Sequence, residues 1–319
     1  MRTDVIALGE LLIDFTLNGE SSQGNPLFEA NPGGAPCNVL AMLRKLDKST
    51  AFIGKVGKDQ FGKQLRETIE AAGIDSKYLL EDEQIPTTLA FVHTMPDGDR
   101  SFSFYRKPGA DMMLTADDIT EEMFEDADIF HFGTLSMTHE GSREATLKAL
   151  EIAKRHGMII SLDPNLREPL WDSLDNAKEQ MLKAISYCDV LKISDNEIVF
   201  VTGEDDYEAG IRKLREQFDI KLICLTLGKD GSRVYYGDKR VEAPGFAQPN
   251  VVDTTGAGDT FCVCVLSYIC EHGLGDLSED NLRDMITFAN AAASIVTTRK
   301  GAIRSMPSRD EIANLFLQA

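Results

Sequence analysis

Short apolar segments alternate along this chain with longer segments whose apolar residues recur at helical spacing, and this alternation limits the folds open to it. The expected strands span residues 5–9, 51–56, 128–132, 158–162, 190–193 and 221–226. The expected helices span residues of about 36–46, 61–72, 140–155, 175–187, 207–217, 261–270 and 282–296. Such β-then-α units imply an α/β fold, in which a mostly parallel sheet is covered by helices on both faces.

Two patches of a different character interrupt this pattern. Residues 11–33 are short runs broken by turn residues, and a second patch flanks the turn Pro96-Asp97-Gly98. Both are typical of β-hairpins, and we expect them to join into a small second sheet. The prediction is one α/β domain over residues 1–319, with a β-sheet lid formed by the discontinuous segments of about 11–33 and 87–108.

The composition narrows the class of partner. The 319 residues carry 33 Lys and Arg against 52 Asp and Glu, a formal net charge of −19. Because an acidic surface repels phosphate backbones and anionic lipids, we expect neither nucleic acid nor a membrane as a partner. No apolar run approaches the ~20 residues that span a bilayer, and the N-terminus lacks the pattern of a secretory signal.

The cysteines indicate neither zinc nor a disulfide framework, because no CxxC pair or His-rich tract accompanies them. We therefore expect reduced, buried thiols in a cytoplasmic protein. The six are Cys37, Cys188, Cys224, Cys262, Cys264 and Cys270.

The most informative segment is DTTGAGDTF at 253–261, which runs directly into an apolar helix. Gly256, Ala257 and Gly258 let the backbone come close to a ligand, and the N–H groups of a helix start bind anions. Asp259, in the first helical turn, would then stand beside the anion. Phosphoryl transfer needs both N–H donors for the moving charge and a base for the attacking hydroxyl. The same residues also fit an ordinary helix start, with Asp259 stabilising the helix dipole.

A second Gly-rich segment is GGAPCN at 33–38, in which Pro36 stands near the first position of the next helix. Gly33, Gly34 and the polar Asn38 would let a polyol lie against the backbone. A tight turn is the plain alternative.

A third segment, GKDQFGK at 57–63, fits the first part of a nucleotide-binding P-loop. The next residue is Gln64 rather than the Ser or Thr that a P-loop uses for Mg²⁺, and the pattern ends inside an expected helix. We therefore reject a P-loop.

Polar segments also follow three expected strands, where open α/β sheets place their ligands. After one strand comes DPNLR, whose Arg167 could contact phosphate or simply lie on the surface. After the next comes SDNE at 194–197, whose acids could serve a hydrated Mg²⁺ or cap a helix. Residues 226–231 follow the third strand, and one crevice could draw on all of these segments.

These motifs together resemble the PfkB/ribokinase family of carbohydrate kinases along nearly the whole chain. GGAPCN at 33–38 and GKVGKDQFG at 54–62 match its N-terminal signature, and DTTGAGDTF at 253–261 matches its C-terminal signature. Three further stretches resemble the fructokinases of the family: GELLIDF at 9–15, FYRKPGADMML at 104–114 and DPNLREPLW at 163–171.

The resemblance implies a ribokinase-like fold and transfer of the γ-phosphoryl group of ATP to a sugar hydroxyl. Asp259 would be the general base, and the N–H groups of residues 256–258 would form the anion hole. The residues implied to hold the sugar are Asp14, Gly33, Gly34, Asn38 and, less firmly matched, Arg106 and Arg167. Those implied to line the nucleotide are Ser194, Thr226, Leu227, Gly228, Lys229, Asp230, Gly231 and Asn290.

The resemblance also implies two metal ions. Glu197 would act on Mg²⁺ through water, and Asp253, Thr255 and Ser305 match the region where members bind a monovalent cation such as K⁺. The family motif N-x-x-E begins here with Ser194 instead of Asn, a form associated with the fructokinase-like branch.

We expect the substrate to be a ketohexose, D-fructose in the first place, phosphorylated at a primary hydroxyl. A ribokinase and a 2-keto-3-deoxygluconate kinase are the alternatives within the same chemistry. A catalytically silent sugar or nucleotide sensor is the alternative from another class, and the intact residues 256–259 weigh against it. The exposed faces of the lid could pair two subunits into a homodimer.

Overall fold

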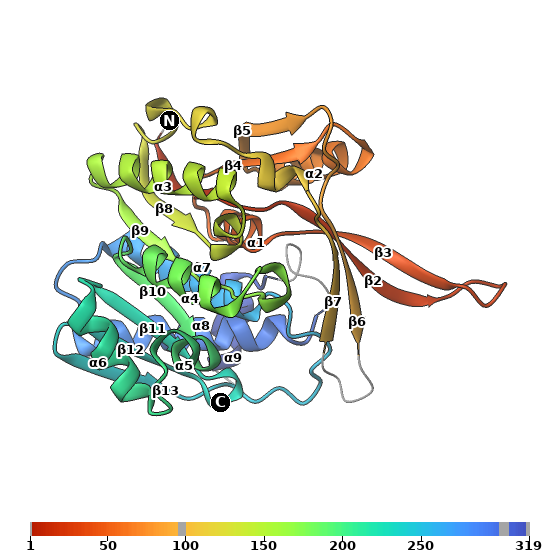
Figure 1. Cartoon of the computed structure of the whole chain (residues 1–319). Coiled ribbons are helices and arrows are strands. Elements are labelled where there is room, and N and C mark those ends of the chain that lie inside the picture. The colour runs from red at the N-terminus through yellow and green to blue at the C-terminus, as the bar shows by residue number, and fades with distance from the viewer. Residues whose placement is uncertain (1, 95–99, 300–305, 317–319) are drawn as a thin grey trace.

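The computed structural model describes residues 2–94, 100–299 and 306–316, and its main body is a nine-stranded sheet (Figure 1). The strands lie in the order β13-β12-β11-β10-β9-β8-β1-β4-β5. The parallel part consists of β1 (Thr3–Leu8), β4 (Thr50–Gly57), β5 (Asp75–Asp82), β8 (Ala127–Phe132), β9 (Ile159–Leu162), β10 (Val190–Ser194) and β11 (Leu222–Thr226). The antiparallel strands β12 (Ser232–Tyr236) and β13 (Lys239–Ala243) extend one edge.

The parallel α/β fold is confirmed, but the sequence prediction lacked the edge strands β5 and β13 and the strand β12 next to β13. The residues of β5 are mostly half-buried or exposed, β12 is a short strand that contains Arg233, and β13 carries the charged residues Lys239, Arg240 and Glu242. Edge strands bury less of their surface than central strands do. They therefore lack the continuous apolar run by which the central strands were recognised.

Two layers of helices enclose the sheet, because successive residues of each strand point to opposite faces. Val5 and Ala7 of β1 belong to one core cluster, and Ile6 and Leu8 belong to the other. The first cluster packs under α1 (Ala35–Arg44), α2 (Gln60–Ala71), α7 (Ala257–His272), α8 (Glu279–Val296) and α9 (Arg309–Phe316). The second packs under α3 (Glu140–Arg155), α4 (Leu174–Ile185), α5 (Asp195–Thr202) and α6 (Tyr207–Gln217). Short 3-10 helices lie at Ala110–Met113, Ala116–Asp118, Glu121–Met123, Thr134–Met137, Glu168–Leu170 and Gly228–Asp230.

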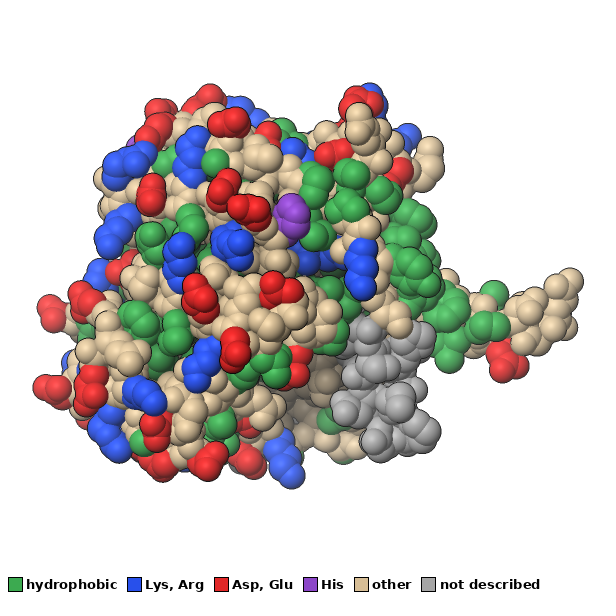
Figure 2. Space-filling view, viewed as in Figure 1, with side chains coloured by type: hydrophobic (Ala, Val, Ile, Leu, Met, Phe, Trp, Pro, Cys, Tyr) green, Lys and Arg blue, Asp and Glu red, His purple; other side chains and the backbone are tan. Residues whose placement is uncertain are grey.

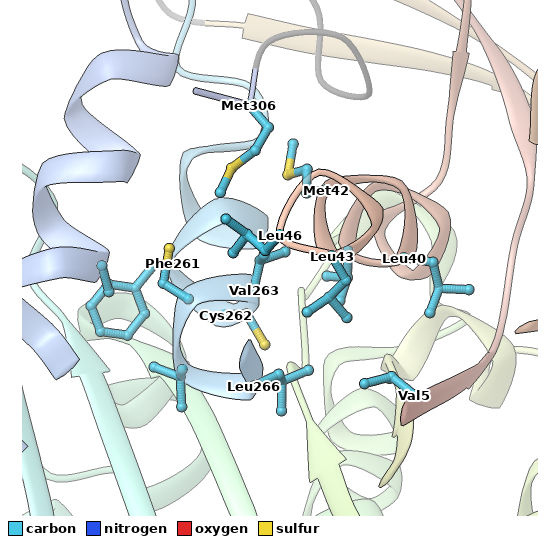
Figure 3. Packing of buried hydrophobic residues seen from close by; sticks show 14 of the residues in the cluster. Val5, Leu40, Met42, Leu43, Leu46, Phe261, Cys262, Val263, Leu266 and Met306 are labelled. Atoms are coloured by element: carbon cyan, nitrogen blue, oxygen red, sulfur yellow. The ribbon is translucent and has the colours of Figure 1, made fainter. Parts of the chain in front are cut away.

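Helices α1 and α7 lie side by side in the first layer, although they are more than 200 residues apart in sequence. Figure 3 shows Leu43 of α1 and Leu46, in the turn after α1, facing Val263 and Leu266 of α7. All four side chains are buried. The first turns of the two helices, where both Gly-rich segments lie, are also in contact, through a hydrogen bond between Asn38 and Asp259.

The two hairpin patches form one four-stranded sheet in the order β3-β2-β6-β7, which extends away from the main body (Figure 1). Its strands are β2 (Leu12–Glu20), β3 (Pro26–Gly33), β6 (Leu89–Thr94) and β7 (Arg100–Tyr105). β2 pairs with β6 in parallel, which joins the two segments as expected. The predicted turn at 96–98 lies outside the described residues.

The rejected P-loop pattern ends inside a helix, as the sequence predicted. Asp59 caps α2 by accepting a hydrogen bond from the N–H of Gly62, and it also accepts bonds from the N–H and hydroxyl of Thr87. Asp59 therefore ties the start of α2 to the base of the second sheet. Among the helices of the described residues, none is long and apolar enough to span a membrane.

Candidate active site

The start of α7 has the backbone of an anion site. Gly256 adopts the left-handed conformation with a φ of 80°, and no side chain caps the helix that follows. The first N–H groups of a helix have no carbonyl partner within it, and they form the positive end of the helix dipole. The predicted anion-hole residues Gly256, Ala257 and Gly258 lie at this helix start, where the N–H of Ala257 donates a hydrogen bond of 3.3 Å to the carbonyl of Thr254. Their role as an anion hole stays a prediction.

Asp259 stands one residue further on, in the first turn of α7. Its Oδ2 accepts a hydrogen bond of 2.8 Å from Asn38 Nδ2, which comes from the first turn of α1. The other amide atom of this side chain, Oδ1, is buried and has no hydrogen-bond partner among the described residues. A buried acceptor of this kind fits a ligand hydroxyl.

Electrostatics shift the pKa of Asp259 in both directions. Burial raises the pKa above its ordinary value, while the hydrogen bond from Asn38 and the charges of Lys192 and Arg167 lower it. Burial has the largest effect, so the pKa stays raised. An acid with a raised pKa is better suited to accept a proton near neutral pH.

Asp14 reaches the same place from β2 of the second sheet. Burial raises its pKa to about 7, Arg167 lowers it, and Asp253 and Asp259 raise it. A Cβ atom on Gly33, which pairs with Leu12 of β2, would lie 2.3 Å from Asp14 Oδ2. Only glycine therefore leaves room for this carboxylate, and the interaction of Asp14 with Asp259 brings it near the start of α7.

Glu10 is a member of this region that the sequence analysis did not propose. It is buried at the end of β1, and its Oε1 accepts a hydrogen bond of 2.7 Å from the N–H of Ala35, at the start of α1. Gly34 has a φ of 120°, and a Cβ there would lie 2.3 Å from the carbonyl oxygen of Glu10. An acid within the apolar run before β2 was the signal that could have identified Glu10.

Arg106 lies at the base of the second sheet in a buried ion pair. Its Nη2 is 2.7 Å from Asp111 Oδ2, and the guanidinium also donates to Thr138 Oγ1 and to the carbonyl of Leu135. Asp111 in turn accepts a hydrogen bond from Thr88. The contact of Arg106 with sugar stays a prediction. The bonds seen here link Arg106, which follows β7, through Asp111 to Thr88, which precedes β6.

We expect Arg106→Ala to lower the free energy of unfolding by roughly 3–5 kcal/mol, because it leaves the carboxylate of Asp111 buried without its cation. Urea unfolding followed by circular dichroism measures the change. Arg2→Ala, which removes an exposed partner of Asp128, is the control and should cost far less. Unchanged stability together with a raised KM for the sugar would contradict this structural role and favour direct sugar contact.

A buried cation lies beneath the start of α7, and the sequence analysis missed it. Lys192 Nζ, from the middle of β10, lies 3.0 Å and 3.2 Å from the two carboxylate oxygens of Asp163 at the end of β9. A Cβ atom on Gly258 would lie 3.1 Å from this ammonium. A lysine within an otherwise apolar strand was the signal that could have identified it.

Glu197 is held tightly by the chain itself. Its Oε2 accepts hydrogen bonds from the N–H and the hydroxyl of Ser194, and its Oε1 accepts one of 2.8 Å from the N–H of Leu166. Burial raises its pKa, but Lys192 and these hydrogen bonds lower it further, so that the pKa ends below its ordinary value. Glu197 therefore remains ionised and forms a capping box with Ser194 at the start of α5, while its role toward Mg²⁺ stays a prediction.

The predicted nucleotide residues gather at neighbouring strand ends. Thr226 of β11 pairs in register with Ser194 of β10, and the 3-10 helix Gly228–Asp230 follows. Asn290 of α8 donates hydrogen bonds of 3.1 Å to the carbonyls of Ala243 and Pro244, beside this loop. A Cβ on Gly231 would lie 2.2 Å from the carbonyl oxygen of Ala243, so the two loops touch through backbone.

Two of the predicted cation residues, Asp253 and Thr255, lie on the loop before α7. The N–H of Thr255 donates a hydrogen bond of 2.6 Å to Asp253 Oδ1, and the N–H of Asp253 donates to the carbonyl of Thr297. Ser305 lies outside the described residues. Within the described part of the chain, no group of three or more His, Cys, Asp or Glu side chains could hold a metal ion.

Comparison with known proteins decides the family to which this site belongs. Residues 2–309 match the pfkB family carbohydrate kinase. The chain belongs to that family. This confirms the sequence-based assignment and makes the protein an ATP-dependent sugar phosphotransferase.

Individual members of the family resemble the whole chain. Fructokinase-1 of Zea mays is 41% identical over 320 residues, which cover 100% of this chain and 99% of the relative. A fructokinase from Xylella fastidiosa with bound ATP superposes with a TM-score of 0.91 at 29% identity, covering 100% of this chain and 99% of its own. A fructokinase double mutant from Vibrio cholerae O395, bound to fructose, ADP and potassium ion, has a TM-score of 0.87 at 29% identity, covering 98% of both chains. The predicted ribokinase-like fold is therefore confirmed.

Proposed function

We propose that this pfkB-family kinase transfers the γ-phosphoryl group of ATP to a primary hydroxyl of D-fructose. The observation that carries the proposal is the hydrogen bond between Asp259 and Asn38, which sets a half-buried carboxylate beside the uncapped start of α7. Similarity over the full length to fructokinases, at about 40% identity for the plant proteins, supports fructose as the sugar.

The chemistry assigned to these residues is an in-line displacement. The hydroxyl oxygen of the sugar attacks the γ-phosphorus of ATP, the bond from that phosphorus to the bridging oxygen breaks, and ADP leaves. The hydroxyl proton passes to Asp259. The N–H groups of residues 256–258 bind the charge that develops on the transferred phosphoryl group.

We assign sugar binding to Asp14, Gly33, Gly34 and Asn38. The carboxylate of Asp14 and the partnerless Oδ1 of Asn38 both accept hydrogen bonds, as hydroxyl recognition requires. Closure of the second sheet over the sugar would exclude water and limit hydrolysis of ATP. This is the role that we propose for the lid segments.

Magnesium fits the nucleotide end of the crevice. When bound, it neutralises charge on the β- and γ-phosphates of ATP. Both oxygens of Glu197 already accept hydrogen bonds from the chain, so this carboxylate would hold the ion through water. The remaining ligands would be phosphate and water oxygens, which Mg²⁺ commonly keeps.

We propose K⁺ as the monovalent ion near the anion hole, with Asp253, Thr255 and Ser305 as the matching residues. The potassium-bound fructokinase of Vibrio cholerae supports the choice of ion. Omitting K⁺ from the assay is then expected to lower kcat. Equal kcat in K⁺ and in a large organic cation would contradict it.

ADP release in the presence of ATP and a panel of sugars tests the function. We expect kcat/KM to be highest for fructose among fructose, ribose, 2-keto-3-deoxygluconate and nucleosides. Faster turnover of ribose or 2-keto-3-deoxygluconate would move the assignment to one of the other sugar kinases. Binding of sugar without ADP release would favour a sensor.

The second sheet also suggests how two subunits could pair. Asp14 and Phe15 point to opposite faces of β2, and the face away from the crevice carries an aromatic cluster of Phe15, Phe28, Phe91 and Tyr105. Tyr105 is 67% exposed and Leu17, on the same face, is 58% exposed. Figure 2 shows this apolar surface on the projecting sheet. We propose that it pairs with the same face of a second copy.

Sedimentation velocity at micromolar concentration is expected to give a dimer, and Leu17→Asp should dissociate it because a buried charge at an apolar interface is costly. Leu174→Asp, at an exposed apolar residue of α4 outside this sheet, is the matched control. A monomer for the unaltered protein, or a dimer that persists in Leu17→Asp, would overturn the pairing.

We propose a cytoplasmic location. All six cysteines are free thiols and five of them are buried, which suits a reducing compartment. Cell fractionation tests the location, and recovery of the protein with an organelle would contradict it.

A further inference from the structure

The ion pair beneath the anion hole has no role in the function proposed so far. Lys192 and Asp163 are both buried, with Lys192 7% and Asp163 3% exposed. Taking two charges out of water is costly, and such a pair often stabilises a fold no better than apolar side chains would. Its position, directly against the first turn of α7, therefore calls for another explanation.

Three elements fix the ammonium of Lys192 in place. The strand β10 carries it, Asp163 at the end of β9 binds it through both oxygens, and Gly258 of α7 lies so close that a Cβ there would be 3.1 Å away. The charge of Lys192 also lowers the pKa of Cys262, which lies one turn after Gly258 on α7. The cation is thus seated against the helix turn that carries Asp259.

The surroundings of Asp259 are rich in acids. Asp259 interacts with Asn38 of α1, Lys192 of β10, Arg167 after β9, Asp14 of β2, Asp163 at the end of β9 and Cys262 of α7. Asp14 in turn interacts with Asp253. The groups that interact with Lys192 also include Glu197, Cys224 and His131. ATP adds further negative charge when it binds. The positive charge of Lys192 opposes this negative charge and lowers the pKa of Asp259.

We propose that Lys192 is a positioning residue whose buried positive charge, held by Asp163, fixes the turn at Gly258 and keeps Asp259 ionised. This inference rests on the proposed role of Asp259 as the base. Lys192 is suited to the task because strand and ion pair hold its ammonium against Gly258. Arg167, in contrast, lies on the loop after β9.

The test is the pH dependence of kcat/KM for fructose at saturating Mg-ATP. In Lys192→Met the acidic limb is expected to move to higher pH by about one unit, because a nearby opposite charge lowers the pKa of an acid by about 1–3 units. Below the limb this equals a loss of about tenfold. Fructose KM on the alkaline plateau should change little, since Lys192 does not reach the sugar residues.

Two variants that retain the positive charge at position 192 separate this electrostatic role from a merely structural one. Asp163→Asn keeps the ammonium and removes the anion beside it, so its acidic limb should move to lower pH, opposite to Lys192→Met. Lys192→Arg keeps the charge and should keep the limb near its original position even if kcat falls. These variants also serve if Lys192→Met does not fold. Lys221→Met, which removes a surface ion pair with Asp189, is the matched control.

The outcomes distinguish a failure of the role inferred for Lys192 from a failure of the role proposed for Asp259 as the base. If Asp259→Asn is inactive but the limb of Lys192→Met superimposes on that of the unaltered enzyme, the role of Lys192 is wrong and that of Asp259 stands. Equal shifts in one direction for Lys192→Met and Asp163→Asn would also overturn the inference, since a structural disturbance would act alike in both. Near-normal turnover of Asp259→Asn would instead remove the proposed base itself.

Discussion

Replacing Asp259 by Asn is expected to lower kcat for fructose phosphorylation at least ~100-fold while the KM for fructose changes little. General-base catalysis contributes roughly 10²–10⁴ in rate, or about 3–5 kcal/mol of barrier. The substitution keeps the size of the side chain and removes only its ability to accept the hydroxyl proton. Steady-state ADP release measures kcat and KM separately. A group that acts only in the transition state affects kcat rather than KM.

The same carboxylate determines how the rate depends on pH. A base must be ionised to accept a proton, so kcat/KM should fall as the pH drops through the pKa of Asp259. Burial raises that pKa, and Asn38 and Lys192 oppose the rise. Asp238→Asn, at an exposed acid in the turn between β12 and β13, is the control and should leave rate and profile unchanged. Turnover within a few fold of normal in Asp259→Asn would disprove the assignment.

Replacing Asp14 by Ala is expected to raise the KM for fructose about 10- to 100-fold, with a smaller effect on kcat. A hydrogen bond to a charged group contributes about 1.5–3 kcal/mol, and one tenfold change corresponds to about 1.4 kcal/mol. Asp14 is on the second sheet and is assigned to sugar binding rather than to proton transfer, so binding rather than chemistry should suffer. Steady-state kinetics with fructose as the varied substrate measures the change.

A second variant tests the same contact without removing the carboxylate. Gly33→Ala places a Cβ 2.3 Å from the present position of Asp14 Oδ2 and must displace it. We therefore expect a raised KM for fructose here too, and an unchanged KM for ATP. A kcat loss with normal fructose KM in both variants would show that Asp14 does not bind the sugar.

The central fold was predictable from the sequence because its strands are buried on both faces. Val190–Ser194 and Leu222–Thr226 are almost wholly buried and read as mainly apolar runs, although the first contains Lys192. β5 was missed because its residues are mostly half-buried or exposed. The joining of β2 to β6 was anticipated as one sheet, but its parallel register depends on segments far apart in sequence and is set by tertiary packing.

The candidate site was predictable where a motif carries its own chemistry. Residues 256–259 combine small residues, a helix start and an acid, so their role could be inferred locally. The partnership of Asp259 with Asn38, 221 residues away, depends on the packing of α1 against α7. Lys192 was missed because one lysine in a strand has no local sign of its partner, and only the sheet order places Asp163 beside it.

The most direct test of this account is to identify the product that the purified enzyme forms from fructose and ATP with Mg²⁺. Phosphorus-31 NMR should show one fructose monophosphate, esterified at a primary carbon, appearing in step with ADP. The Asp259→Asn protein should form it at least ~100-fold more slowly. Release of ADP and inorganic phosphate without a sugar ester, or an ester formed with ribose but not with fructose, would contradict the assignment.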